Sequence, residues 1–202
     1  MSLDIDEDGN INLKVIFVGD SGVGKTNLIN VTYDGTFNEL ETSTSNASYV
    51  VKKAEVDGQK VNLYLWDTIG QERMRAITKL FFNDSKIVVL VYDITNKYSF
   101  ASLDYWLSQV KDSLDLDKIV IGICGNKNDL FEKEEVTQEQ GKEFAEKINA
   151  QYALTSAKES KEGFWDFLIS LIRQYLEKND GNNIEKKISI KSNSYKKKKH
   201  NR

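Results

Sequence analysis

The sequence has no proline, one cysteine, and no apolar run that approaches the length of a membrane span. The single cysteine, Cys124, excludes a disulfide within the chain and therefore the class of small disulfide-stabilised folds. Because Cys124 adjoins the apolar run 119–123, we expect a buried structural thiol. The first residues are acidic and lack the apolar segment of a secretory signal. These absences favour an intracellular, cytoplasmic protein.

Charge is distributed unevenly along the chain. Residues 181–202 carry seven lysines, one arginine and one glutamate, a net charge of about +7. Because the whole chain carries −3, about −10 remains for residues 1–180. An acidic body argues against nonspecific binding of nucleic acid, whereas a basic tail can contact an anionic surface.

Short apolar runs alternate with amphipathic stretches, which predicts a single α/β domain with a mostly parallel sheet. The dipeptide Asp57-Gly58 is typical of a hairpin, so the strands on either side of it are expected to pair antiparallel. Trp106 and Trp165 are expected to be packing residues. We predict strands near 13–19, 47–56, 61–66, 87–92, 119–125 and 151–154, and helices at 25–33, 72–83, 98–112, 137–149 and 163–177. We expect an N-terminal extension over 1–10, a folded domain over 11–178 and a disordered basic tail over 179–202.

The most informative motif is Gly19-Asp20-Ser21-Gly22-Val23-Gly24-Lys25-Thr26, a loop of the form GxxxxGK[ST] after an apolar run. Its glycines allow backbone N–H groups to curl around a phosphate chain, and a lysine at this spacing reaches the terminal phosphates. The threonine hydroxyl can hold Mg²⁺. A helix N-terminus directly after the loop adds partial positive charge. The candidate phosphate-binding residues are therefore Asp20, Ser21, Gly22, Val23, Gly24, Lys25 and Thr26.

A second motif, Asp67-Thr68-Ile69-Gly70-Gln71, ends the third predicted strand. In open α/β sheets, ligands bind beyond the carboxyl ends of the strands. Asp67 in that position can hold Mg²⁺, the N–H of Gly70 can approach a γ-phosphate, and Gln71 can orient an attacking water. A capped strand end that leads into a helix would explain the same residues.

Two further motifs follow the fifth and sixth predicted strands. In Asn126-Lys127-Asn128-Asp129, the Asp129 carboxylate can accept two parallel hydrogen bonds from guanine, which adenine does not offer. In Thr155-Ser156-Ala157-Lys158, a backbone N–H could recognise the guanine carbonyl. Each tetrapeptide alone could be a polar turn or a helix start, but four motifs in this order, each just past a strand end, are seldom accidental.

With these residues, the chain resembles the Ras superfamily of small GTPases, and most closely the Rab family, over residues 11 to about 177. Ser21 and the stretches 66–72, 75–78 and 90–95 are similar to Rab sequences. The resemblance implies a P-loop small G domain, with a six-stranded mostly parallel sheet, one antiparallel strand and about five helices. It implies a GTP/GDP switch with slow hydrolysis, on the order of 10⁻⁴ s⁻¹, in which Gln71 positions water. The γ-phosphate would order two loops, and a GAP would supply an arginine.

The resemblance also assigns residues in the first switch loop. Phe37 matches the aromatic residue that packs beside guanine. Thr44 matches the Mg²⁺-sensing threonine, because twelve positions back from Val56 and seven forward from Phe37 both reach it. Residues 34–46 are polar and without periodicity, which is typical of a functional or mobile loop. The implied Mg²⁺ ligands are Thr26, Thr44 and Asp67, and the other nucleotide-binding residues are Gly70, Asn126, Lys127, Asp129, Ser156, Ala157 and Lys158.

Three departures from the family pattern fall in or near the switches. Ser45-Asn46 replaces Ile-Gly, Ile69 replaces a small alanine, and residues 81–84 replace a Tyr-Tyr-Arg-like element. They motivate one alternative, a guanine-nucleotide-binding module with little or no hydrolysis. A P-loop ATPase or kinase is a second alternative, which predicts that ATP competes with GTP.

The last residues, 196–202, contain no cysteine that could accept the prenyl chain usual in Rab proteins, and Ser2 excludes N-myristoylation. We therefore expect no lipid anchor. The lysines would attract an anionic membrane by about 1 kcal/mol per charge. Charge alone binds weakly and is screened by salt, so a solvated tail is the preferred interpretation; a nuclear-localisation signal is a weaker one. We expect a monomer that acts in vesicle trafficking with an exchange factor, a GAP and effectors.

Overall fold

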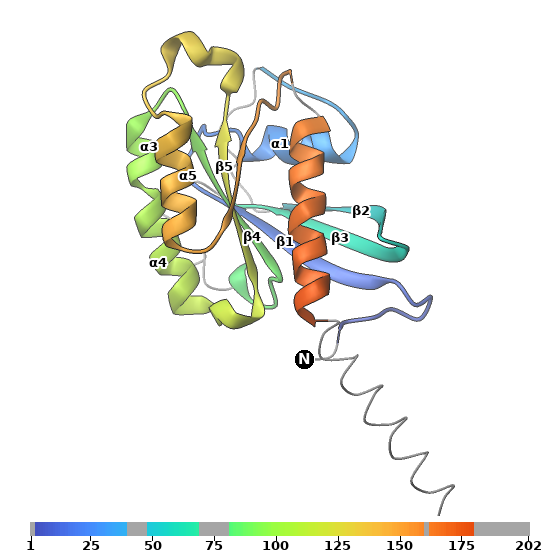
Figure 1. The fold of residues 1–202 in the computed structure, drawn as a ribbon. Coiled ribbons are helices and arrows are strands. Elements are labelled where there is room, and N and C mark those ends of the chain that lie inside the picture. The colour runs from blue at the N-terminus through green and yellow to red at the C-terminus, as the bar shows by residue number, and fades with distance from the viewer. Residues whose placement is uncertain (1–2, 40–47, 69–80, 160–161, 180–202) are drawn as a thin grey trace, which may run out of the picture.

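The computed structural model describes residues 3–39, 48–68, 81–159 and 162–179. They form a six-stranded sheet of order β2-β3-β1-β4-β5-β6 with helices on both faces (Figure 1). The predicted sheet is confirmed, including its single antiparallel strand, β2. The strands are β1 Ile11–Val18, β2 Ser48–Val56, β3 Gln59–Asp67, β4 Ile87–Asp93, β5 Val120–Asn126 and β6 Gln151–Leu154.

Five α-helices flank the sheet within the described ranges. One core layer contains α1 and the helix 162–179, and the other contains α4 and α5. No helix in the described part of the chain is long and apolar enough to span a membrane. The helices are α1 Lys25–Tyr33, α3 Lys97–Ala101, α4 Leu103–Ser113, α5 Gln138–Lys147 and the unlabelled helix 162–179, with short 3₁₀ turns η2 Leu116–Lys118 and η3 Asn128–Lys133.

The central strands are apolar on both faces because helices cover both sides of the sheet. In β1, Val15 and Phe17 belong to one core layer, whereas Ile16 and Val18 belong to the other. All seven residues of β4 are buried. This alternation fixes the register of the strands, since a slip by one residue would exchange the two sets of side chains.

The predicted β2–β3 hairpin is confirmed. Its turn residues, Asp57 and Gly58, have φ of 51° and 79°, as a two-residue turn of this kind requires. The guanidinium of Arg173, on the helix 162–179, donates to both carboxylate oxygens of Asp57 at 2.7 and 3.1 Å. These hydrogen bonds lower the pKa of Asp57 and tie the hairpin to that helix.

The helix predicted over 98–112 is present as two consecutive helices, α3 and α4, that meet at Ser102, whose backbone stays in the αR region. The Ser99 hydroxyl donates to the Asn96 carbonyl at 2.7 Å, and the Ser102 hydroxyl donates to the Tyr98 carbonyl at 3.0 Å. Backbone hydrogen bonds from Ser102 to Tyr98 at 2.9 Å and from Trp106 to Ser102 at 3.0 Å continue through this junction, so the hydroxyl bonds accompany the helical pattern. The helix predicted over 72–83 lies mostly outside the described residues, as do nearly all residues of the predicted tail.

Candidate nucleotide-binding site

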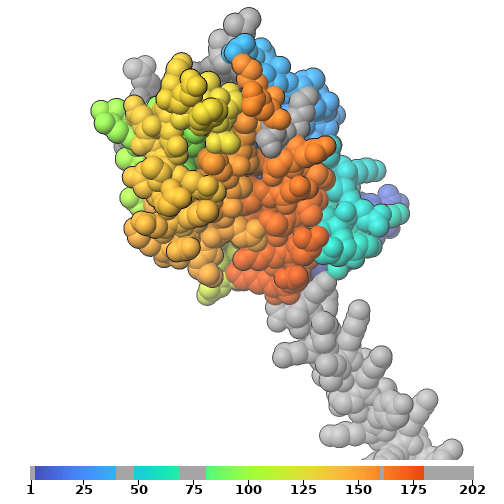
Figure 2. Space-filling view, turned by 45° about the horizontal axis from the view of Figure 1, so that its top comes forward, coloured from blue at the N-terminus to red at the C-terminus, as the bar shows by residue number. Residues whose placement is uncertain are grey.

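All four motifs lie within the described residues, three of them in whole and the Asp67 motif in part, and they meet at the carboxyl ends of the parallel strands, at the top of Figure 1. The glycine-rich loop joins β1 to α1, Asp67 ends β3 and Asn126 ends β5. The turn 155–158 follows β6. With this edge turned forward in Figure 2, the orange segment after β6 lies beside the blue segment around α1.

The glycine-rich loop contains two glycines at which any side chain would collide with a neighbouring atom. At Gly19, a Cβ would collide with the carbonyl oxygen of Val91. At Gly24, where φ is +97°, a Cβ would collide with the side-chain nitrogen of Asn126. Both glycines therefore allow the loop to lie close against β4 and β5.

Lys25 is only 5% exposed, although it carries a charge. Its ammonium donates to the carbonyl of Gly19 at 2.9 Å and to the carbonyl of Asp20 at 2.8 Å. Burial lowers its pKa to about 8, against the opposing influence of the Asp67 and Asp20 carboxylates. A buried cation folded over a loop of backbone N–H groups would be stabilised by the negative charge of a phosphate.

The two described candidates for Mg²⁺ ligands lie together. The Thr26 hydroxyl donates to Oδ2 of Asp67 at 2.6 Å, and Asp67 is 4% exposed. Hydroxyl and carboxylate oxygens are the hard donors that Mg²⁺ prefers, so this pair fits the ion. The described residues contain no cluster of three or more His, Cys, Asp or Glu side chains suited to a metal. Phosphate and water oxygens would therefore have to complete the coordination shell.

Asn126 joins the glycine-rich loop to the turn after β6. It is 1% exposed, its Nδ2 donates to the carbonyl of Val23 at 2.9 Å, and its Oδ1 accepts from the N–H of Ala157 at 3.2 Å. One buried amide thus fixes the spacing between the region that would hold phosphates and the region that would hold a base.

Asp129 is held by the same turn. The Ser156 hydroxyl donates to Oδ1 of Asp129 at 2.5 Å and accepts from the N–H of Lys158 at 3.2 Å. The N–H of Asn128 donates to the Thr155 carbonyl at 2.9 Å. The 126–129 and 155–158 motifs therefore form one unit with a preset carboxylate orientation.

Comparison with known proteins agrees with this geometry. The model of the Ras family matches residues 14–177. The chain belongs to the Ras family. Ras-related protein Rab-30 of Homo sapiens is 36% identical over 181 residues, which cover 88% of this chain and 89% of the relative. Ras-related protein Rab-21 of Geodia cydonium is 36% identical over 169 residues, 84% of this chain and 73% of the relative. The predicted resemblance is confirmed, and this Ras-family chain is a Rab-like small GTPase.

Two contacts of this Ras-family site were not predicted from the sequence. The Lys127 ammonium lies 2.7 Å from a carboxylate oxygen of Asp93, at the end of β4. The indole N–H of Trp106 donates to Oδ1 of Asp20 at 2.9 Å, so Trp106 is more than the packing residue we expected. A buried indole N–H needs an acceptor, which is the signal that could have pointed to this contact.

The remaining predicted site residues divide into two groups. Phe37 is half-buried against the core that contains α1, and Lys158 pairs with Glu39 at 3.2 Å. That ion pair is exposed and contributes little to stability. Thr44, Gly70 and Gln71 lie outside the described residues, as do the departures at 45–46 and 69.

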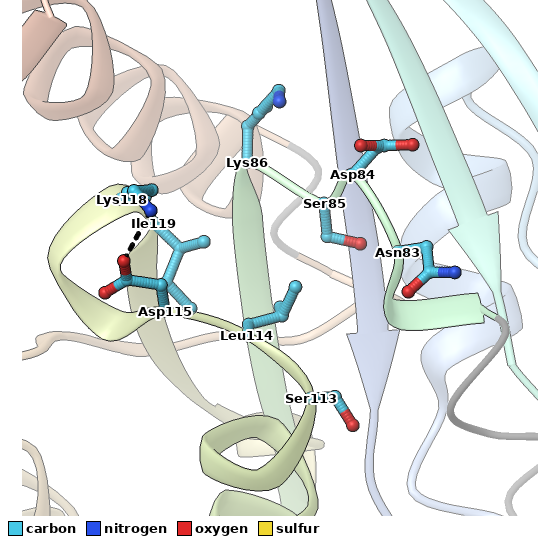
Figure 3. Close-up of a pocket in the computed structure, with 9 residues that line it drawn as sticks. All are labelled: Asn83, Asp84, Ser85, Lys86, Ser113, Leu114, Asp115, Lys118 and Ile119. Carbon is cyan, nitrogen blue, oxygen red and sulfur yellow. Dashed lines mark ion pairs between the residues drawn. The ribbon is translucent and has the colours of Figure 1, made fainter. Parts of the chain in front are cut away.

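A separate hollow of about 330 Å³ lies at the other end of the sheet, where β4 and β5 begin (Figure 3). The only ion pair drawn there, Lys118 with Asp115 at 2.7 Å, is exposed. The hydroxyls of Ser85 and Ser113 also line the hollow and find no hydrogen-bond partner among the residues that the structure describes. None of the four motifs contributes to this hollow.

Proposed function

We propose that this Rab-like protein is a switch that binds GTP and GDP with Mg²⁺ and hydrolyses GTP slowly. The observation that supports this most strongly is the double contact of Asn126 with Val23 and Ala157. It connects a loop shaped for phosphates to a turn that orients Asp129, and a triphosphate nucleotide needs both regions at a fixed distance. The family match also favours this function over a P-loop ATPase or kinase.

The chain's own residues divide the work of binding. The backbone N–H groups of 20–24 and the ammonium of Lys25 hold the phosphates, and the N-terminus of α1 adds partial positive charge. Thr26 and Asp67, with Thr44, hold Mg²⁺, which neutralises charge that develops on the phosphates. Because Lys25 is already buried, a bound phosphate replaces the carbonyl oxygens that now satisfy its ammonium.

Base selection rests on Asp129, with Asn126, Lys127, Ser156, Ala157 and Lys158 around it. A carboxylate held by the Ser156 hydroxyl can accept from the ring N–H and the exocyclic amine of guanine. Adenine would leave this carboxylate with unpaired hydrogen-bonding groups, which costs about 1–3 kcal/mol for each buried group.

We further propose that two residues of the Asp67 motif, Gly70 and Gln71, act in GTP hydrolysis. Gln71 would orient the attacking water and Gly70 would contact the γ-phosphate, with a GAP to accelerate the reaction. Ile69 directly precedes this pair and Asn46 follows Thr44 by two positions, where the family carries smaller residues. These two residues favour a second candidate function, a guanine-nucleotide-binding module with little or no hydrolysis.

A role in vesicle trafficking, with an exchange factor, a GAP and effectors, follows from similarity to proteins named Rab-30 and Rab-21. We further propose that the chain is a monomer in the cytoplasm and that its basic tail makes only weak, salt-sensitive contact with anionic membranes. Flotation with phosphatidylserine vesicles at low and physiological salt tests the membrane contact. Absence of co-migration at both salts would refute it.

The decisive experiment identifies the nucleotide that co-purifies with the protein and then times a single turnover of bound GTP in the presence of Mg²⁺. We expect guanine nucleotide and release of phosphate over minutes to hours, on the order of 10⁻⁴ s⁻¹. Bound adenine nucleotide would contradict the base assignment. Bound GTP that yields no phosphate, with or without a GAP, would support the binding module instead.

A further inference from the structure

Asp20 places a carboxylate in the loop proposed to bind phosphates. The residue directly follows Gly19, and its own carbonyl accepts from the Lys25 ammonium at 2.8 Å. A carboxylate near a triphosphate is unfavourable, because like charges repel with about 4 kcal/mol at 4 Å and an effective dielectric constant of 20. Something in the fold must therefore control where this side chain points.

The indole of Trp106 supplies that control. Its N–H donates to Oδ1 of Asp20 at 2.9 Å across 86 positions of sequence. Trp106 is 4% exposed and lies in α4, in the core layer with Leu103, Leu107 and Val110. The ring is held by this packing, so the direction of its N–H is fixed by the core rather than by the loop.

We propose that Trp106 is a positioning residue for nucleotide binding: its indole N–H holds the Asp20 carboxylate on the α4 side of the phosphate loop. The Asp20 carboxylate is then held on the indole and does not turn toward the phosphates that the backbone N–H groups and Lys25 would bind. A hydrogen bond to a charged acceptor is among the stronger ones in proteins, so a single contact suffices. This inference rests on the proposed function and adds α4 to the elements that govern it.

Two substitutions distinguish an effect of the Trp106–Asp20 hydrogen bond from an effect of Trp106 packing. Trp106→Phe retains most of the ring but removes the N–H, which releases the carboxylate. Asp20→Asn removes the negative charge but keeps an oxygen that can accept from the indole. If Trp106 acts through Asp20, the faster release of nucleotide caused by Trp106→Phe depends on the Asp20 charge. The effect of Trp106→Phe then disappears when Asp20 is already replaced by asparagine.

The test measures the dissociation rate of a fluorescent GDP analogue from the full chain with Mg²⁺. Loss of a hydrogen bond to a charged group predicts release about tenfold faster for Trp106→Phe. The dissociation rates of Asp20→Asn and of the double variant are expected to agree within about twofold, since the coupling between Trp106 and the Asp20 charge is absent from both. Salt should weaken the effect of Trp106→Phe, because the repulsion is screened. Trp165→Phe, on a half-buried tryptophan of the helix 162–179, is the matched control and should leave the rate unchanged.

The outcomes distinguish this inference from the proposed function. If the unsubstituted protein binds no guanine nucleotide, the proposed function fails and the positioning role with it. If it binds GDP but Trp106→Phe is without effect, or acts equally in the Asp20→Asn background, only the positioning role is overturned. Should Trp106→Phe not fold, the indole ¹H–¹⁵N resonance of Trp106 in the GDP-bound protein serves instead. A shift on Asp20→Ala supports the bond, and an unchanged resonance overturns it.

Discussion

The side chain of Asn126 donates to the backbone carbonyl of Val23 at 2.9 Å, across 103 positions of sequence. The same amide accepts from the N–H of Ala157 at 3.2 Å, so three loops of the candidate site share one buried residue. Both of these hydrogen bonds are buried, so removal of the amide would leave the two backbone groups without this partner. Nucleotide binding and the stability of the fold are therefore expected to respond together to a change at this position.

Asn126→Ala should lower the free energy of unfolding by about 2–4 kcal/mol, because it leaves two buried backbone groups without their partner. Denaturation in urea, with nucleotide removed, measures the loss. Asn128→Ala is the control, since Asn128 is exposed and contributes only its backbone N–H to Thr155. That variant is expected to stay within about 0.5 kcal/mol of the parent. Equal losses in the two variants would contradict the role given to Asn126.

Asp93→Asn should weaken binding of GDP by about tenfold, because it removes the charge that holds the Lys127 ammonium. Asp93 is 7% exposed, and its carboxylate accepts from both the N–H and the hydroxyl of Thr95 as well as from Lys127. Titration with a fluorescent GDP analogue gives the dissociation constant.

The matched control for Asp93 is Asp115→Asn. Asp115 also pairs with a lysine, Lys118, at 2.7 Å, but both side chains are about half exposed and far from the motifs. Exposed pairs contribute little, so GDP binding should be unchanged. If the Asp93→Asn variant binds GDP as tightly as the Asp115→Asn variant, Asp93 does not contribute to GDP binding.

Cys124 predicts a pH dependence of stability. Burial raises the pKa of its thiol from 9.0 to about 12, with the Thr155 hydroxyl acting in the opposite direction. Between these values the unfolded chain has lost the thiol proton while the folded chain keeps it, so stability falls as pH rises. From pH 8 to 10, the parent should lose about 1 kcal/mol more than Cys124→Ala, at about 1.4 kcal/mol per unit above the unfolded pKa. Parallel curves for the two proteins would contradict a buried thiol.

Ser85→Ala should leave the melting temperature unchanged or raise it. The Ser85 hydroxyl is buried at the hollow in Figure 3 and has no partner among the described residues, so its removal forfeits no hydrogen bond there. An unpaired buried hydroxyl costs about 1–3 kcal/mol, which alanine would recover. Ser99→Ala is the contrast, because the Ser99 hydroxyl donates to the Asn96 carbonyl at 2.7 Å and accepts from the N–H of Asp93 at 3.0 Å. A large loss at Ser85 with none at Ser99 would contradict both assignments.

The sequence predicted the sheet well because its signals are local. Apolar runs mark the strands, and Asp57-Gly58 marks the hairpin, since only a few residues accept its backbone angles. The junction of α3 and α4 at Ser102 was not predicted, because Ser102 keeps αR backbone angles and the apolar periodicity does not change there.

The candidate site was predictable where one motif contains all the chemistry, as in residues 19–26. Contacts between motifs were not. The Asp93–Lys127 pair and the Trp106–Asp20 bond join side chains that are 34 and 86 positions apart. No spacing rule connects such residues. Asp93 and Lys127 meet because β4 and β5 bring their carboxyl ends to one edge, and Trp106 reaches Asp20 because α4 packs against the sheet.

The central claim is that Asp129 selects guanine, and competition binding with Asp129→Asn tests it most directly. GTP, ATP and XTP are titrated against a fluorescent GDP analogue on the parent protein, and against a fluorescent XDP analogue on the variant. The parent should prefer GTP over ATP by at least about a hundredfold, as expected when mispaired buried groups are left behind. The variant should bind GTP more weakly and XTP more tightly than the parent does, because an amide at this position offers xanthine the complementary donor. Unchanged preference for GTP in Asp129→Asn would contradict the account.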